Sequence, residues 1–591
     1  MRSILRRGRS WDVSDLPSQS LIASIGAALG CATPFAVVLA QRGGTDWQGL
    51  IDPSLEDLHS PFLLDGMTEA LDRIQLAIAR SERVFIHGDF DADGLTGAAV
   101  LYRGIRPFLP KNSIKVEVGD RAHGHGLSKS FVLRAIEEGF SLVLTVDCGI
   151  GNADEIAQLK QAGIDTIVTD HHLPTGERPD AVAIIDPHQP GDTYPNKHLA
   201  GVGVAYKLVC GLHERLGQPM PAHLLDLVAL GTIADLVPLS HRGESENRAF
   251  IREAFTQMAR GAGSSLGLRA LLAKLSVSAK KLSTMDIGYL VAPKLNAANR
   301  AGDPKVAFLL LITESSEQAE YLAEILIDYN KDREIAQTDM IAQADEQLRD
   351  NGIDPREAGL VFLSGDYWNE GILGLVASNL SDRFGVPAIV MSRGDRVSRG
   401  SCRSVGTFDI SACLHEHRDL LLQFGGHRMA AGFSVANENV PELEERLLEY
   451  AERHRPEMEM RAASTLDARL RLRDVSLRLF TNLTSLGPYG PGNREPNFLV
   501  EGCTFDDLTL VGNRRQHLKG RVSQDGHSVS FIGFRMAKYL EEFERGEDAS
   551  LVCHVGFDDW RNDVQLRALD LVESSELQGA SGVTAVNAEG A

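Results

Sequence analysis

Three aspartates that follow a short apolar run constrain the fold of this chain more than any other stretch. The stretch is RVFIHGDFDADGLTGAAVL, starting at Arg83, in which residues 84–86 are apolar and Asp89, Asp91 and Asp93 alternate with other residues. Three like charges this close repel one another, so a buried strand that ends in them needs neighbours that offset the charge. A helical pattern follows Gly94, which predicts a strand, a polar loop and a helix.

The alternation of strand and helix continues to about residue 190. Strand-like runs lie at residues 83–88, 114–118, 141–149, 164–172 and 182–187, and helical patterns lie at 95–109, 128–139 and 152–163. Near-continuous apolar strands separated by helices predict a parallel sheet that is covered on both faces. Ligands of such sheets bind beyond the carboxyl ends of the strands. The segments HGDFDAD, DCG and DHH, each at a strand end, should therefore meet in one crevice.

The chain is too long for one hydrophobic core, so several domains are expected. We predict an α/β multidomain fold with a parallel-sheet domain, a long helical linker, a second α/β domain and a C-terminal OB-like β-barrel. The expected boundaries are an N-terminal extension at 1–65, the parallel-sheet domain at 66–240, the helical linker region at 241–355, the second α/β domain at 356–458, the barrel at 459–573 and a disordered tail at 574–591.

Net charge, cysteine content and one apolar stretch indicate the cellular compartment of the protein. The net charge of -21 argues against nonspecific coating of polyanions, although local basic patches can still bind nucleic acid. Seven cysteines without a CxxC pair indicate a reducing compartment. The uncharged stretch at residues 21–40 fits either a membrane segment or two short core helices. Its Ala and Gly content and Pro34 favour the core helices, so we expect a cytoplasmic protein without a membrane anchor.

The polar residues at the strand ends predict a metal site. A crevice with five aspartates needs positive charge, and oxygen ligands with a few imidazoles suit Mn²⁺ or Mg²⁺ better than zinc. The cluster is large enough for two ions, and two metals about 3.5–4 Å apart activate water and clamp the leaving oxygen in phosphoryl hydrolysis. The convergent residues are His87, Asp89, Asp91, Asp93, Asp147, Asp170, His171 and His172.

Each motif alone also has a structural explanation. DxDxDG could be a calcium loop, but position 100 is Val where that loop needs Glu. An aspartate at a strand end can cap the next helix, and a His pair can be incidental. Three such motifs at consecutive strand ends of one sheet make the metal site the better interpretation.

Two further segments suit phosphate binding. SRGSCRS at 398–404 and FGGHRMAAG at 424–432 combine glycines with Ser and Arg donors, although a Gly-rich turn with solvated arginines explains them too. NAANR at 296–300 could be a helix end. Cys148 and Cys402 lack a base partner and are interpreted as packing residues. The basic run at 513–521 fits a solvated hairpin and a phosphate-tracking surface equally well.

Together these motifs resemble the DHH phosphoesterase superfamily. HGDFDADG, DCG, TDHHLP and GTIADLVPL are similar to its catalytic domain, and GSCRS and FGGHRMAAG are similar to its DHH-associated domain. Over about residues 63 to 498 the match is to the branch of single-strand-specific exonucleases. This resemblance implies hydrolysis of single-stranded DNA from 5′ to 3′ with release of 5′-mononucleotides, in recombination and repair. It also implies two divalent cations, Mn²⁺ or Mg²⁺.

The resemblance also implies a role for each site residue. His87 and Asp91 would hold one metal, Asp93, His171 and Asp235 the other, and Asp147 would bridge them. Asp89 and Asp170 would support these ligands as part of the catalytic machinery, and His172 would meet the scissile phosphate. The residues expected to bind the nucleotide and its 5′-phosphate are Arg121, Arg300, Ser401, Arg403, Ser404, Gly425, Gly426 and His427.

The chain departs from the family pattern at two positions and leaves two other functions open. Cys402 and Asn299 stand where the family commonly has glycine.

The alternative functions are a superfamily enzyme that cleaves cyclic dinucleotides or short oligonucleotides, and an inactive scaffold that only binds single strands. Length and the terminal barrel oppose the first, and the complete ligand set opposes the second. The family further implies a monomer that meets single-strand-binding protein and a RecQ-type helicase.

Overall fold

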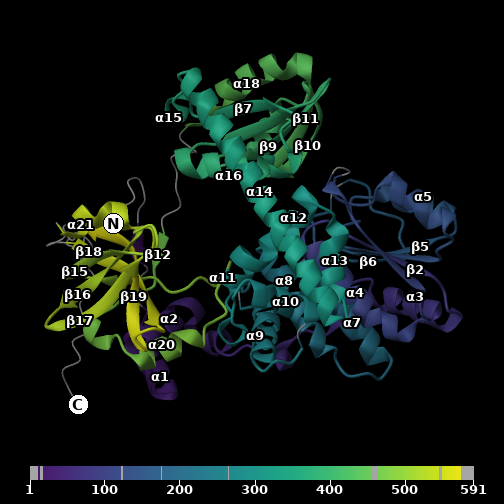
Figure 1. Ribbon diagram of the computed structural model, residues 1–591. Helices are drawn as coiled ribbons and strands as arrows, with labels where there is room; N and C mark the ends of the chain where they lie inside the picture. Colours follow the sequence, from purple (N-terminus) through teal and green to yellow (C-terminus); the bar gives the residue numbers. More distant parts are fainter. Residues whose placement is uncertain are drawn as a thin grey trace. The chain divides into compact units, whose positions relative to one another are not determined.

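The computed structural model describes residues 11–13, 17–121, 124–174, 176–241, 243–263, 265–455, 464–544 and 549–573 (Figure 1). The chain forms two compact units. One consists of Met1–Leu58, Pro238–Arg252 and Ala462–Ala591, and the other of His59–Val237 and Glu253–Arg461. The predicted tail at 574–591 lies outside the described residues. The predicted domain boundaries stay predictions.

The parallel sheet predicted from the strand pattern is present in the second unit. Its strands are β2 (Val84–Gly88), β3 (Ile114–Val118), β4 (Leu142–Val146), β5 (Asp165–Thr169) and β6 (Ala183–Ile185), all parallel, in the order β3-β2-β4-β5-β6. The chain moves outward from β2 in both directions, so the carboxyl ends of β2 and β4 flank the switch point where ligands bind in such sheets.

Helices cover both faces of this sheet. They are α3 (Met67–Arg80), α4 (Ala92–Ile105), α5 (Lys129–Glu137), α6 (Ala153–Gln161) and α7 (Gly201–Arg215). The α4 and α7 helices pack on each other and on one face. The α5 and α6 helices bury Phe131, Ile156 and Leu159 on the other face, against Phe85 and Val143. The double covering explains why the strands are apolar throughout.

A helical region follows in the chain. It contains α8 (Leu225–Ala234), α9 (Glu246–Ala259), α10 (Leu266–Lys274), α11 (Thr284–Asp286), the π-helical turn η8 (Ile287–Val291), α12 (Ala292–Ala301), α13 (Pro304–Ile312) and α14 (Ser316–Asp350). The long α14 confirms the predicted linking helix. It packs against α12 at one end and α16 at the other (Figure 1).

The second α/β domain is built on a five-stranded sheet. Its strands are β7 (Val361–Asp366), β8 (Ala388–Arg393), β9 (Val397–Arg403), β10 (Leu421–His427) and β11 (Ala430–Ala436), in the order β10-β11-β9-β8-β7, with helices α15 (Pro355–Ala358), α16 (Glu370–Phe384), α17 (Ile410–Glu416) and α18 (Val440–Arg453). Gly432 on β11 pairs with Ser401 on one side and Gly425 on the other. This register brings the SRGSCRS and FGGHRMAAG segments side by side.

The first unit contains the C-terminal sheet. Its seven strands are β13 (Ala468–Arg469), β14 (Phe498–Val500), β15 (Thr504–Val511), β16 (His517–Gln524), β17 (His527–Gly533), β18 (Ala549–Asp558) and β19 (Asp563–Glu573), in the order β13-β14-β18-β19-β17-β16-β15. The helices α20 (Leu477–Thr484) and α21 (Leu540–Glu544) accompany this sheet, and β1 (Trp11–Val13) pairs with β12 (Ser464–Leu466).

The N-terminal apolar stretch folds as two short helices in the core of this unit. They are α1 (Gln19–Leu29) and α2 (Thr33–Gly43), and Phe35 and Leu39 are buried in one hydrophobic core with Phe498 and Leu551. The prediction of a pair of core helices is therefore confirmed. Among the described residues no single helix is long and apolar enough to cross a bilayer, although α1 and the segment after it pass that test as a pair bent by 116°.

One helix contact offers a test of the fold. Gly267, in the first turn of α10, lies so close to α13 that a Cβ placed there would be 1.9 Å from the backbone oxygen of Leu310. We expect Gly267→Ala to push the two helices apart and to lower stability by about 1–3 kcal/mol, measured as a lower midpoint of thermal unfolding. Gly26→Ala in α1 is the control, because a Cβ there meets no atom within 4 Å. Unchanged stability of Gly267→Ala would show that α10 and α13 are not in this contact.

Candidate metal centre

Two aspartates after β2 are anchored by backbone N–H groups at the starts of helices. Asp91 caps α4, and its Oδ1 accepts hydrogen bonds from the N–H of Asp93 at 2.9 Å and of Gly94 at 3.2 Å. Asp93 accepts from the N–H of Gly201 at 2.6 Å and of Val202 at 2.8 Å, at the start of α7. Helix starts favour negative charge, so both carboxylates are fixed with part of their charge offset.

Asp89 lies between these residues and a loop that the sequence analysis did not connect to the site. It is 2% exposed, and its Oδ2 lies 2.8 Å from Nδ1 of His125, whose ring packs 4.5 Å from the ring of Phe90. The hydrogen bond to Asp89 raises the pKa of His125. His125 lies four residues after Arg121, the one residue of this loop that the sequence predicted for the site, and no spacing in the sequence pairs His125 with Asp89.

Asp147 is held in a strained backbone conformation at the end of β4. Its φ is +62°, in the left-handed region that residues other than glycine seldom adopt, and its N–H donates to the backbone oxygen of Thr169 at 3.0 Å. Gly201 leaves it room, because a Cβ at that position would lie 2.6 Å from Cβ of Asp147. Strain of this kind persists where the surroundings fix it, which is common at functional sites.

Asp170 holds the two histidines that follow it. Its Oδ1 accepts from the N–H of His171 at 2.8 Å and of His172 at 3.2 Å, and lies 2.8 Å from Nδ1 of His172. Its Oδ2 accepts from the N–H of Ile150 at 2.9 Å, which ties the loop after β5 to the loop after β4. Nδ1 of His188 lies 2.8 Å from the backbone oxygen of His171. Asp170 therefore positions both loops.

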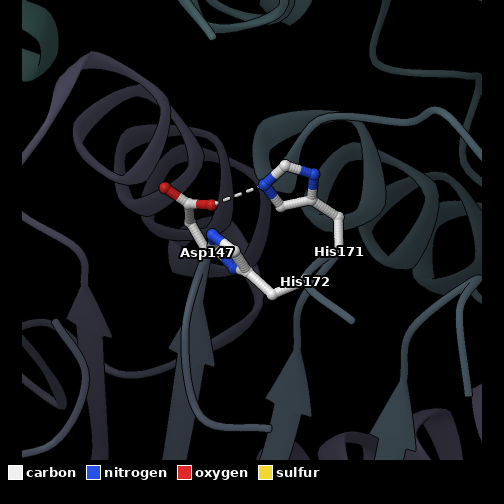
Figure 2. Close-up of side chains that lie close together, drawn as sticks. All are labelled: Asp147, His171 and His172. Atoms are coloured by element: carbon white, nitrogen blue, oxygen red, sulfur yellow. Dashed lines mark ion pairs between the residues drawn. The ribbon is translucent and has the colours of Figure 1, made fainter. Parts of the chain in front are cut away.

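His171 is the point at which the aspartates from three segments meet. Its Nε2 lies 3.0 Å from Oδ1 of Asp147, 3.7 Å from Oδ2 of Asp235 and 3.9 Å from Oδ2 of Asp93. Figure 2 shows His171 facing Asp147, with His172 beside them. Asp235 follows the last residue of α8, so the site combines the parallel sheet with the helical region.

The donor atoms form three overlapping groups, each with its members within 4.8 Å of one another. The groups are Asp147 with His171 and His172, Asp93 with His171 and Asp235, and Asp89 with Asp91 and Asp147. Oδ1 of Asp147, Nε2 of His171 and Oδ1 of Asp89 are buried without a hydrogen bond. Buried polar atoms are almost always satisfied, so these atoms fit a bound cation. Carboxylate oxygens with one or two imidazoles suit Mn²⁺ and Mg²⁺.

The electrostatics of the metal-free protein agree with this interpretation. Burial, and after it a neighbouring carboxylate, raises the pKa of Asp93 and of Asp235 to about 7. The same two causes raise the pKa of Asp147 well above its usual value. Burial lowers the pKa of His171, which favours the neutral imidazole that a metal ligand must be. A bound cation would offset the charge of the carboxylates and so keep them ionised despite their burial.

His172 differs from His171. Its hydrogen bond with Asp170 raises its pKa to about 9, so it is a cation at neutral pH. Its side chain is 46% exposed, whereas that of His171 is 12% exposed. His172 is therefore suited to donate a hydrogen bond to an anion at the surface of the site.

His87 stands apart from the other residues predicted for the site. It is buried at the end of β2 with its ring 4.6 Å from that of Phe131, and burial lowers its pKa. Neither ring nitrogen makes a hydrogen bond of ordinary geometry to the described residues. It belongs to none of the three groups, whereas Asp89 and His172 do. The predicted division between ligands and supporting residues stays a prediction.

Three arginines come together on the side of Asp89 and Asp91. The charges of Asp91 and Asp89 act on Arg121, and those of Arg121 and Arg403 act on Arg300. Burial is the main cause that lowers the pKa of Arg300, to about 9, and the other two arginines add to it. None of the three has a carboxylate ion pair within the described part of the chain.

Other contacts fix these arginines in place. Nη1 of Arg300 donates to the backbone oxygen of Gly371 at 2.5 Å, and Nη1 of Arg403 donates to that of Cys402 at 2.8 Å. Oδ1 of Asn299 accepts from the N–H of Arg121 at 3.4 Å, a contact that glycine at position 299 could not make. The guanidinium of Arg121 itself lies over the ring of Phe90, with its Cζ 4.6 Å from the ring centroid. Three guanidinium groups held close together without a carboxylate partner suit a phosphate.

The remaining residues predicted for the nucleotide pocket lie on neighbouring strands. Arg403 and His427 both pair with Ala430 of β11, and the strand with Gly425 and Gly426 is largely exposed. Ser404 is buried, and its hydroxyl donates to the backbone oxygen of Phe408 at 2.8 Å. Ser404 therefore supports the loop in this structure. Cys148 and Cys402 are buried, which confirms their interpretation as packing residues.

Three known domain families match the chain. Residues 83–232 match the DHH family, N-terminal domain, residues 357–453 match the DHHA1 domain, and residues 466–570 match the RecJ OB domain. The DHH and DHHA1 matches cover the two α/β domains, and the third match covers most of the C-terminal sheet. The predicted fold class is thereby confirmed.

Similar proteins and solved structures match most of the chain. The single-stranded-DNA-specific exonuclease RecJ of Bacillus subtilis is 35% identical over 560 residues, covering 93% of this chain and 69% of that protein. The RecJ of Thermus thermophilus is 34% identical over 521 residues, covering 87% and 72%. The crystal structure of Thermus thermophilus RecJ with Mn²⁺ matches at a TM-score of 0.81, with 29% identity over 96% of this chain and 80% of that one. The structure with Mg²⁺ matches at 0.74, with 28% identity over 95% and 78%.

Removal of the shared carboxylate tests the metal centre. We expect Asp147→Asn to weaken Mn²⁺ binding beyond the ~10–100-fold loss typical of residues that only orient ligands, because Asp147 belongs to two of the groups. Titration calorimetry measures the affinity, and Asp154→Asn, exposed in the first turn of α6, is the control. Wild-type affinity of Asp147→Asn would place the metal elsewhere.

The raised pKa values predict protons released on metal binding. Below pH 7 the metal-free protein holds protons on Asp93 and Asp235, and a cation that binds the ionised carboxylates must displace them. Mn²⁺ binding should release more protons at pH 6 than at pH 8, and its affinity should rise with pH up to about 7. Calorimetry in buffers of different ionisation enthalpy measures the release. Equal release at both pH values would contradict the assignment.

Proposed function

The chain belongs to the RecJ family of single-stranded-DNA-specific exonucleases, and we propose that it removes 5′-mononucleotides from the 5′ end of a single DNA strand by two-metal hydrolysis. The observation that carries this proposal is the adjacency of two opposite sites. On one side, the buried carboxylates and His171 bring together donor atoms that make no hydrogen bond. On the other side lie three arginines without carboxylate partners in the described part of the chain. One side fits divalent cations and the other fits the phosphate of a strand end.

The metal-binding residues divide into two sets that share Asp147. Asp89, Asp91 and Asp147 would hold the cation nearer the arginines, and Asp93, His171 and Asp235 would hold the second. Asp147 would contribute to both sites, because its Oδ1 also lies 3.0 Å from Nε2 of His171. Divalent cations in such a pair supply a water nucleophile at neutral pH and offset the charge on the oxygens of the reacting phosphate. The protein fixes this geometry through the caps of α4 and α7 and through Asp170.

His172 and Asp170 act together on the scissile phosphate. Asp170 keeps the His172 ring oriented and protonated, since their hydrogen bond raises the pKa of His172 to about 9. An imidazolium at this place donates a hydrogen bond to a phosphoryl oxygen, on which negative charge increases in the transition state. The exposed side chain of His172 leaves it free to reach the substrate.

Recognition of the strand end falls to the arginines. Arg121, Arg300 and Arg403 would contact the 5′-phosphate, while Ser401, Gly425, Gly426 and His427 would line the first nucleotide. A phosphate at the end of a strand has one more free oxygen and more negative charge than one within the strand, so a cluster of guanidinium groups binds it in preference. This preference sets the 5′ to 3′ polarity.

The proposed function also implies a cellular location and protein partners. Recombination and repair intermediates supply single strands, so we place the enzyme in the cytoplasm with the DNA, acting as a monomer beside single-strand-binding protein and a RecQ-type helicase. The seven-stranded C-terminal sheet, which matches the RecJ OB domain, would bind the single strand. The basic run at 513–521 lies on β16 and the turn before it, where both of its interpretations stay open.

A nuclease assay separates the three candidate functions. Purified protein with Mn²⁺ should shorten a single strand labelled at its 3′ end progressively from the 5′ end, release mononucleotides and leave a blunt duplex intact. Comparable or faster turnover of a cyclic dinucleotide would identify a different enzyme of the superfamily. Binding of DNA without cleavage of any substrate would identify a scaffold.

The arginine cluster generates a second test. We expect Arg403→Ala to raise KM for 5′-phosphorylated single strands by roughly 10–100-fold, because hydrogen bonds to charged groups contribute about 1.5–3 kcal/mol. Its Mn²⁺ affinity should be unchanged. The preference of the wild type for a 5′-phosphate over a 5′-hydroxyl should shrink in the variant.

The matched control is Arg396→Ala, which removes an exposed arginine just before β9. It should behave as the wild type in both assays. Loss of metal from Arg403→Ala would mean that Arg403 supports the structure of the centre rather than the strand end.

A further inference from the structure

Three exposed apolar side chains lie at the end of helix α8 and on the helix that packs against it. Leu236 is 66% exposed, Met285 is 62% exposed and Tyr289 is 71% exposed. Leu236 directly follows the metal-centre residue Asp235, and Tyr289 lies in the π-helical turn η8. We call these three residues the Tyr289 ledge. The proposed exonuclease activity assigns them no role.

The contacts of the helices bring the members of the ledge to one place. Helix α8, which ends just before Asp235, packs against η8, and a Cβ placed on Gly288 would lie 3.8 Å from Cγ2 of Ile233. The N–H of Leu236 still donates to the backbone oxygen of Ile233, one helical turn back. Leu236 and Tyr289 are thus each one turn or less from the same contact between α8 and η8.

The backbone is distorted at both parts of the ledge. Leu236 has φ +62°, a conformation that is costly for a leucine, and the five residues of η8 form a π turn within an otherwise continuous helix from 284 to 301. Both features occur preferentially at functional sites. Within η8, Ile287 and Val291 are buried while Tyr289 faces solvent, so the turn presents the tyrosine without disturbing the core.

The same helix leads into the catalytic centre. Two turns beyond Tyr289, Oδ1 of Asn296 accepts from the N–H of Ala92 at 2.8 Å, at the start of α4 between Asp91 and Asp93. The ledge is therefore continuous with the site through Asp235 and through this helix. It adjoins the group of Asp93, His171 and Asp235, whereas the charges that act on Arg121 are those of Asp91 and Asp89. The arginines and the ledge thus adjoin different metal groups.

The arginines, the two metal groups and the ledge follow one another across the site, and this order indicates what binds at the ledge. If the 5′-phosphate lies at the arginines and the first phosphodiester at the metals, the rest of the strand leaves past Asp235. Exposed Lys280 and Lys281 precede Met285 by a few residues in the chain and bring positive charge to the segment that leads into this helix. An aromatic ring and apolar side chains beside cations are the features of sites that stack unpaired bases regardless of sequence.

We propose that the Tyr289 ledge stacks the bases of the single strand on the 3′ side of the scissile bond. The proposal rests on the exonuclease function given above and adds a positioning site to it. Bases within a duplex are stacked on each other and paired, so they cannot lie flat on the ledge. The ledge thus favours single strands over duplexes independently of the width of the active site.

Kinetics on two substrates test this proposal. The substrates are a 5′-phosphorylated single strand and the same strand with abasic residues in place of all nucleotides after the second. Tyr289→Ala should raise KM on the intact strand by roughly tenfold with little change in kcat, because stacking contributes about 1–3 kcal/mol per base. Tyr289→Phe should restore KM, since the ring is retained. Tyr321→Ala, a tyrosine 67% exposed on α14, is the control and should match the wild type.

The abasic strand separates stacking from a structural effect. The wild type should have a higher KM on the abasic strand than on the intact one, and Tyr289→Ala should have the same KM on both. A wild-type KM of Tyr289→Ala on the intact strand would overturn the proposal, and so would a penalty for abasic residues that persists in the variant. If the wild type itself fails to shorten single strands, the exonuclease function is wrong, which is a different outcome from failure of the ledge alone.

Discussion

The structure depends on the cost of placing several carboxylates in one buried crevice. Asp89, Asp93 and Asp147 are almost fully buried. Burial raises the pKa values of Asp93 and Asp235 to about 7, and the charge of Asp235 adds to the shift of Asp93 and that of Asp91 to the shift of Asp235. In the metal-free protein Asp93 and Asp235 hold protons near neutral pH, and several buried polar atoms of the site make no hydrogen bond, which destabilises the folded state. Divalent cations that bind only the folded state remove that cost and stabilise the fold that built the site.

The surrounding fold holds these carboxylates against their repulsion. Backbone N–H groups at the starts of α4 and α7 bind Asp91 and Asp93, and Gly201 leaves room for Asp147 in its left-handed conformation. Asp170 ties the loops after β4 and β5 to each other. The arginines adjoin Asp89 and Asp91, whereas the exposed Leu236 directly follows Asp235 of the other metal group. Under the proposed function this asymmetry would give a strand a defined direction through the site.

Periodicity and strand ends predicted the parts of this site that are local in sequence. Apolar runs predicted β2, β4 and β5, and the parallel order then required Asp89, Asp147 and His171 to converge, because parallel strands end at one edge. Contacts between loops that are distant in the sequence produce no periodic pattern, so the sequence did not predict them. The pairing of His125 with Asp89 depends on a loop conformation. The room that Gly201 leaves for Asp147 depends on how α7 packs, and the ledge depends on an irregular helical turn. His87 matched a motif, yet lies beside Phe131 outside the groups of donor atoms.

The central claim is that two cations share Asp147 in this crevice. A crystal of the wild-type protein grown with Mn²⁺, measured with anomalous diffraction at the manganese edge, tests it directly. The account predicts two anomalous peaks. One should lie among Asp89, Asp91 and Asp147, and the other should lie among Asp93, His171 and Asp235, with Asp147 bound to both. A single peak, or peaks that leave Asp147 unbound, would contradict it.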